Sequence, residues 1–76
     1  MIKAIVRVFP EGDPILLFPS EEADHQGNIL SYQFVGQHGA ASSKLITELG
    51  YATSDEAQDL IDHYQDHYNC KLELID

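Results

Sequence analysis

Apolar and polar residues alternate along several stretches of this chain, and a period of two is typical of β-strands. In the first stretch Ile2, Ala4, Val6 and Val8 make one face wholly apolar. A short apolar run between prolines follows it, so we expect these two stretches to form a hairpin. The four expected strands cover residues 2–9, 15–18, 29–35 and 70–75.

Two other stretches have the spacing of amphipathic helices. The first is expected over residues 40–49, with Gly50 as its stop. The second begins after Thr53, which stands three residues before Glu56, the spacing of a capping box. It is expected to end at Asn69. The apolar side chains on its predicted core face are Ala57, Leu60, Ile61, Tyr64 and Tyr68.

These elements predict an α+β protein with the order β-β-β-α-α-β, folded as a single small domain over residues 1–76. We expect one mainly antiparallel sheet with the two helices packed on one face. The last strand is expected to pair beside the first. The polar stretch over residues 19–28, which is rich in acids, is predicted to be a loop.

A sheet covered on one side would leave its other face apolar and open. Ile5, Phe9 and Ile75 point to that face in the predicted arrangement, and the run 15–18 is apolar on both faces. The sequence therefore predicts a homodimer formed through the open sheet face. The alternative is that these are scattered surface residues, which are common in monomers.

Charge narrows the classes of partner. Thirteen acids face four basic residues, Lys3, Arg7, Lys44 and Lys71, and the net charge is −9. Direct binding of nucleic acid is not expected, since it needs clustered basic residues, and neither is binding to an anionic membrane. A basic partner or divalent cations fit better. The alternative is that the net charge only keeps a small protein in solution. The sequence has no long apolar run and no signal-peptide pattern, so we expect a cytoplasmic protein.

The first candidate site is the junction between the third strand and the first predicted helix. It consists of Gly36, Gln37, His38 and Gly39, with Lys44 close behind. Glycines permit a sharp turn, and a helix N-terminus favours an anion. This pattern predicts a binding site for a ligand or partner. The alternative is that the glycines only build the turn.

The second candidate is a metal site on the last helix. His63 and His67 are four residues apart and project from one side, with Asp59 one turn earlier. Imidazole and carboxylate ligands suit zinc, nickel or copper. The alternative is a solvated acidic face beside the core residues, and no cofactor is expected.

Three pieces of the chain carry a resemblance to a known group. They are the opening Met1-Ile2-Lys3-Ala4-Ile5-Val6-Arg7, the block Ser31-Tyr32-Gln33-Phe34-Val35-Gly36-Gln37-His38, and the helix start Ala52-Thr53-Ser54-Asp55-Glu56. In these pieces the chain resembles a group of short proteins from bacteria, phages and mobile elements. The position of Phe34 is often histidine in that group, so this chain lacks a second imidazole there. The resemblance implies no particular activity.

No catalytic constellation is present in the sequence, so an enzyme is not expected. The sequence favours a small non-enzymatic protein-interaction module of a bacterium, phage or mobile element. One alternative is a small ligand- or metal-binding protein that uses the Gly36–Gly39 junction. Another is an acidic decoy of a nucleic-acid-binding protein.

Overall fold

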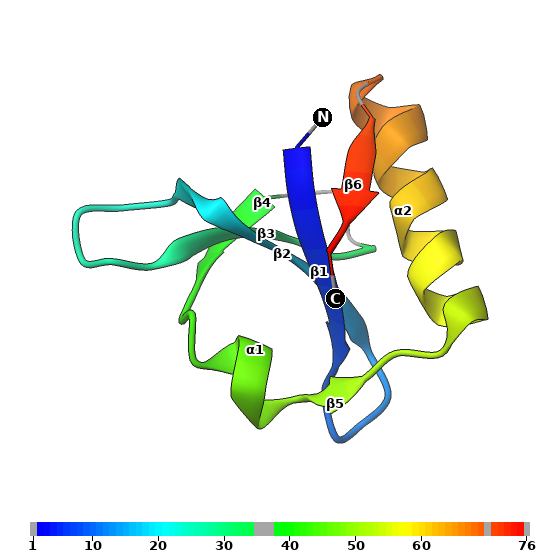
Figure 1. The fold of residues 1–76 in the computed structure, drawn as a ribbon, viewed down its shortest axis with the longest axis horizontal. Helices are drawn as coiled ribbons and strands as arrows, with labels where there is room; N and C mark the ends of the chain where they lie inside the picture. Colours follow the sequence, from blue (N-terminus) through cyan, green and yellow to red (C-terminus); the bar gives the residue numbers. More distant parts are fainter. Residues whose placement is uncertain (1, 35–37, 70, 76) are drawn as a thin grey trace.

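The computed structural model describes residues 2–34, 38–69 and 71–75. Within these ranges the chain forms a six-stranded sheet and two helices (Figure 1). The elements are β1 (Ile2–Val8), β2 (Pro14–Glu22), β3 (Ile29–Tyr32), β4 (His38–Ala41), α1 (Leu45–Glu48), β5 (Gly50–Tyr51), α2 (Ser54–Tyr68) and β6 (Leu72–Leu74). The α+β class is confirmed. No helix in the described ranges has the length and apolar character needed to cross a membrane.

The sheet is mainly antiparallel, as predicted. Its strands lie in the order β4-β3-β2-β1-β5, and β6 also pairs with β1. The expected hairpin of β1 and β2 is present, with Val6 opposite Leu16. The prediction that the last strand pairs beside the first is confirmed. This pairing is parallel, with Ile2 opposite Leu72.

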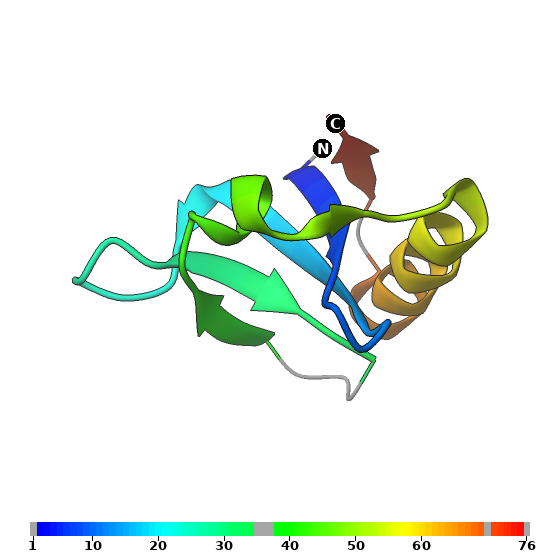
Figure 2. The same cartoon turned by 90° about the horizontal axis from the view of Figure 1, so that it is seen from below.

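The two helices lie against opposite faces of the sheet, so the prediction that both pack on one face is wrong (Figure 2). Successive side chains of a strand point to opposite faces. On one face Val6 and Leu16 pack with α2. On the other face Ile5, Leu17 and their neighbours pack with the apolar side chains around α1.

The sheet face that was predicted to be open is therefore covered by the chain itself. Ile5, Ile15 and Leu17 are buried, and Leu45 and Ile46 pack against them. This burial removes the reason for placing a second copy on that face. Leu74 and Ile75, at the end of the chain, stay exposed.

Arg7 explains why the segment around α1 lies on the second face. Its guanidinium is buried, with 1% of the residue exposed. Nε donates to the carbonyl of Ile46 at 2.8 Å, and Nη1 donates to the carbonyl of Val6 at 3.0 Å. The ring of Tyr51 lies over the guanidinium at 4.4 Å. Arg7 thus ties α1 and β5 to β1 through charged hydrogen bonds and a cation–π contact.

Residues 38–41 form a strand, although the sequence predicted a helix starting at residue 40. In β4, His38 lies opposite Tyr32, and Ala41 lies opposite Ile29. The buried Ser31 hydroxyl also donates to the carbonyl of Gly39 at 3.0 Å. Pairing with β3 satisfies backbone groups at once, whereas a helix start would leave its first N–H groups unpaired. The first helix is therefore short and begins at Leu45.

The acidic stretch after residue 18 is also more ordered than predicted, because β2 continues to Glu22. The loop that follows β2 is held by hydrogen bonds to Asp24. Its carboxylate accepts hydrogen bonds from the Asn28 side chain and from the backbone N–H of Gln26, both at 2.9 Å. These bonds lower the pKa of Asp24, with the Asn28 side chain as the larger cause. Gly27 supplies the positive φ that the loop needs.

The start of α2 has the predicted capping box. The Thr53 hydroxyl accepts from the N–H of Glu56 at 3.2 Å, and the Glu56 carboxylate accepts from the N–H of Thr53 at 3.0 Å. Asn69, in the left-handed conformation, ends the helix as expected. The face that α2 buries comprises Ala57, Leu60, Ile61 and Tyr64.

Replacing the cap by Thr53→Ala is expected to lower the free energy of unfolding by about 1 kcal/mol. The loss arises because N–H groups of the first turn lose their side-chain acceptor. Urea denaturation followed by circular dichroism measures it. The matched control is Ser54→Ala, one residue later and outside the capping box, for which a change within about 0.5 kcal/mol is expected. Equal losses in the two variants would contradict the capping role.

Candidate functional site

Three histidines and three tyrosines meet where α2 packs over the strands β3 and β4. We call this group the tyrosine–histidine cluster. Its members are Tyr32, His38, His63, Tyr64, His67 and Tyr68. The rings come from the neighbouring strands β3 and β4 and from α2, which follows much later in the sequence. Phe18 lies beside the cluster in the core, and Phe34 lies at its exposed side.

Tyr32 is the centre of the cluster and is fully buried. Its hydroxyl is hydrogen-bonded to Nδ1 of His63 at 2.7 Å. Its ring meets those of Tyr64 and Tyr68 edge-on, with centroids 4.9 and 5.6 Å away. Burial, and to a lesser degree the nearby Tyr68, raises the pKa of Tyr32. The buried phenol therefore stays protonated at neutral pH and orients the imidazole of His63.

His38 lies at the start of the edge strand β4 and is largely exposed to solvent. One side of its ring nevertheless rests on aromatic side chains. The centroid of Tyr68 is 4.7 Å from that of His38, and the Tyr64 hydroxyl is 3.2 Å from Nε2. Burial on this side lowers the pKa of His38.

This lowered pKa predicts that acid weakens the fold through His38. The unfolded chain binds a proton near pH 6.5, whereas the folded chain resists binding it. Between the two pKa values the unfolded state holds more protons, so the free energy of unfolding falls as the pH drops through about 6.5. Urea denaturation between pH 7.5 and about 5.5 measures the fall. His38→Asn is expected to show a shallower dependence, and parallel curves for the two proteins would contradict the prediction.

The predicted junction site is changed by the strand β4. Gly39 lies inside this strand, and the helix N-terminus expected just after it is absent from the described residues. Lys44 comes three residues after the strand ends and precedes α1, so the strand separates it from His38. The anion site predicted between His38 and Lys44 therefore lacks the helix N-terminus and the short separation that it needs. Gly36 and Gln37 lie outside the described residues.

The predicted metal ligands are only partly brought together. The rings of His63 and His67 stack almost parallel, at 12° and 5.8 Å between centroids, and Nδ1 of His63 already bonds to Tyr32. Asp59 is exposed on α2 one turn before His63. Among the residues that the structure describes, no three histidine, cysteine or carboxylate side chains form a group that could hold a metal ion. The metal hypothesis gains no support from this arrangement.

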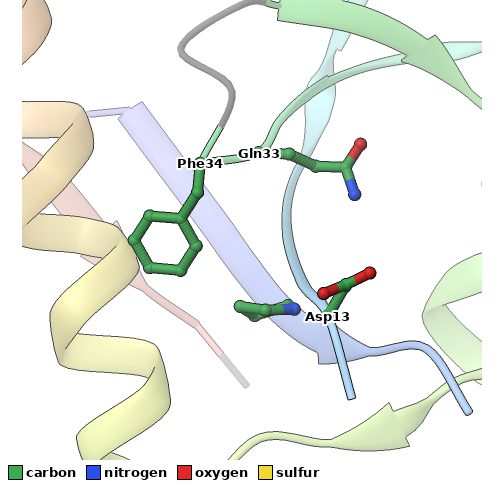
Figure 3. A pocket seen from close by; sticks show the side chains of 4 residues that line it. Asp13, Gln33 and Phe34 are labelled. Atoms are coloured by element: carbon green, nitrogen blue, oxygen red, sulfur yellow. The ribbon is translucent and has the colours of Figure 1, made fainter. Parts of the chain in front are cut away.

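A hollow of about 170 Å³ opens beside the cluster (Figure 3). It is lined by Asp13, Pro14, Gln33 and Phe34. The ring of Phe34 turns toward α2 and packs edge-on against His63 at 5.2 Å. Phe34 stays 45% exposed. The hollow thus offers an apolar wall next to a carboxylate and an amide.

The outer face of α2 carries a row of carboxylates. Asp55, Asp59, Asp62 and Asp66 recur at helical spacing and are all exposed, opposite the buried face of the helix. We call this row the acidic stripe. The three histidines of the cluster lie on or against the same helix. One helix therefore joins a negative surface to an aromatic one.

No family model matches the chain, and neither the curated proteins nor the solved structures contain a match. The resemblance drawn from three sequence pieces therefore stays a prediction. The function has to be argued from the geometry of the cluster and of the acidic stripe.

Proposed function

We propose that this protein is a small non-enzymatic interaction module that binds a basic protein in the cytoplasm of a bacterium, or in a cell that carries its phage or mobile element. The observation that supports it most is that α2 carries the acidic stripe on its outer face and contributes His63, Tyr64, His67 and Tyr68 to the tyrosine–histidine cluster. A surface of this kind combines long-range attraction with aromatic contact area. Both features suit a partner that carries lysine and arginine.

Electrostatics favours a basic partner over an acidic one. The net charge is −9, and one of the four basic side chains, Arg7, is buried. The carboxylates of the acidic stripe face solvent on a single row, where their fields add. Such a surface speeds the encounter with a positively charged protein and repels acidic ones.

The aromatic side chains provide the contacts that hold a partner once it has arrived. Tyr68 is 38% exposed and Phe34 is 45% exposed, on either side of the histidines of α2. Large rings that are half-buried lose little entropy on binding and often dominate interface energies. Their faces also attract lysine and arginine side chains.

The other two hypotheses have less support. A metal-binding function needs a third ligand close to the stacked pair His63 and His67. An acidic decoy needs carboxylates that follow two phosphate backbones, whereas the acidic stripe is one row on one helix. We therefore retain the interaction module.

Capture of proteins from cells that naturally contain this chain tests the proposal. Two triple variants are compared with the unchanged protein by quantitative mass spectrometry. One carries Asp59→Asn, Asp62→Asn and Asp66→Asn in the acidic stripe. The control carries Glu11→Gln, Glu48→Gln and Glu73→Gln, three exposed acids elsewhere, and so loses the same charge.

A basic protein retained by the unchanged chain and by the control, but lost from the stripe variant, is the expected result. Its retention should also fall with added salt, because salt screens exposed charges. Equal retention by all three proteins would contradict the proposal. Failure to retain any protein would contradict it too.

A further inference from the structure

In the part of the chain that the structure describes, the strand β4 has a partner along only one of its two edges. It stands at the end of the sheet and, among the described residues, pairs only with β3. An edge of this kind presents backbone N–H and C=O groups that another strand can bind. Figure 2 shows β4 at the border of the molecule, where the chain leaves it toward α1.

This edge lacks most of the usual protection against strand addition. Natural edge strands are blunted by charged residues, by proline or by a bulge. The strand β4 consists of His38, Gly39, Ala40 and Ala41 and pairs with β3 without a register shift. It carries no fixed charge, in a chain where charged residues make up 22%. Its brevity limits a partner to a few backbone bonds.

The side chains of β4 leave room for those of an added strand. Ala40 lies opposite Leu30 on the sheet face that α2 covers in part, and it is exposed. Gly39 lies opposite Ser31 on the other face. Small side chains at these positions allow long side chains of a neighbouring strand to lie across the sheet.

The surroundings of the edge select for positive charge. At its start, His38 packs on Tyr68, whose exposed ring can receive a cation on its face. At its other end, β4 pairs with Ile29 of β3, and Glu22 pairs with Ile29 from the opposite side, across β3 from β4. A segment laid along β4 would therefore pass a tyrosine at one end, on a protein whose net charge of −9 favours a basic segment.

We propose that the free edge of β4 is the docking edge for an extended, basic segment of the partner, which joins the sheet as one more strand. This inference rests on the proposed interaction function and specifies how the partner binds. Backbone hydrogen bonds to β4 supply the register, and a lysine or arginine side chain meets the ring of Tyr68. A second copy of this chain suits the edge less well, since two proteins of charge −9 repel each other.

Synthetic peptides of alternating lysine and valine test the proposal by calorimetry. One peptide is unmodified. A second carries N-methyl groups on alternate residues, which blocks one edge of the strand and leaves the other able to pair. A third carries the same number of N-methyl groups on consecutive central residues, which blocks both edges there and leaves only short unmodified ends. The second and third peptides are alike in charge and composition.

The third peptide is expected to bind at least about tenfold more weakly than the second, because it loses several backbone hydrogen bonds worth about 1 kcal/mol each. Ala40→Lys is expected to weaken binding of the unmodified peptide, and Ala40→Glu is expected not to. Circular dichroism confirms that both variants fold.

Equal binding of the second and third peptides would overturn strand addition. It would leave the proposed function intact if the acidic-stripe variant still loses the natural partner. Sedimentation that shows a dimer broken by Ala40→Lys would assign the edge to a second copy and would also overturn the inference. If only the partner-capture experiment gave a contradicting result, that result would count against the proposed function instead.

Discussion

Arg7→Ala is expected to lower the free energy of unfolding by about 3 kcal/mol. The substitution removes a buried charged group that bonds to the carbonyls of Ile46 and Val6. Hydrogen bonds to charged groups contribute about 1.5–3 kcal/mol, and their loss leaves buried carbonyls without this donor. A domain of this size has a total stability of only about 5–10 kcal/mol, so the loss is a large fraction of it.

The segment that carries α1 should loosen first in this variant. Its ties to β1 are the guanidinium bond to Ile46, the pairing of β5 and the packing of the second core. Chemical denaturation gives the total loss, and amide hydrogen exchange locates it in residues 42–52. The control is Lys71→Ala, an exposed basic residue, which should change stability by less than about 0.5 kcal/mol. An Arg7→Ala protein as stable as the control would contradict the anchoring role.

Tyr32→Ala is expected to cost about 4 kcal/mol, the largest effect of a single substitution in the cluster. Its side chain is fully buried and touches the rings of His38, Tyr64 and Tyr68. Truncating a buried aromatic residue usually costs about 3–5 kcal/mol, because the site collapses only in part. Thermal denaturation should show a strongly lowered midpoint or no cooperative transition.

Tyr32→Phe distinguishes the contribution of the hydroxyl to stability from that of the ring. It keeps the packing but loses the bond to His63, so a cost of about 1 kcal/mol is expected. A double-mutant cycle with His63→Ala measures the coupling between the two side chains directly. Additive effects of Tyr32→Phe and His63→Ala would contradict the hydrogen bond. An equal cost for Tyr32→Phe and Tyr32→Ala would contradict the packing role of the ring.

Regular periodicity allowed much of the fold to be predicted. The alternation in β1 and the apolar run of β2 predicted the hairpin, and the spacing of Thr53 and Glu56 predicted the start of α2. These signals are local, and each agrees with the tertiary structure. The pairing of β6 beside β1 also followed from the need to cover the same apolar layer.

The chain between β3 and α2 was predicted less well because tertiary contacts decide its structure. Ala41, Leu45, Ile46 and Leu49 have helical spacing, yet Ala41 is in a strand and the others pack on the second face of the sheet. Pairing with a neighbouring strand overrides such weak preferences. Arg7 shows the same effect, since its buried position depends on Ile46 and Tyr51, far along the chain.

The candidate site was only partly visible in the sequence. His38, His63 and His67 were singled out by residue type and spacing. Tyr64 and Tyr68 were assigned to the core by helical periodicity, and Tyr32 by the alternation of the third strand. Their meeting depends on α2 crossing β3 and β4, and no spacing in the sequence encodes that. The free edge of β4 was missed because Ala40 and Ala41 were assigned to a helix, and His38 and Gly39 to the junction before it.

Binding of a basic strand to β4 is tested most directly by mapping chemical shifts. The isotope-labelled protein is titrated with the unmodified lysine–valine peptide, and the amide signals are followed by NMR. The largest changes are expected at Gly39, Ala40 and Tyr68, with new protection from exchange at the alternate β4 amides that point away from β3. Changes centred on Tyr51 of β5 or on Leu74 of β6, with β4 unaffected, would contradict it.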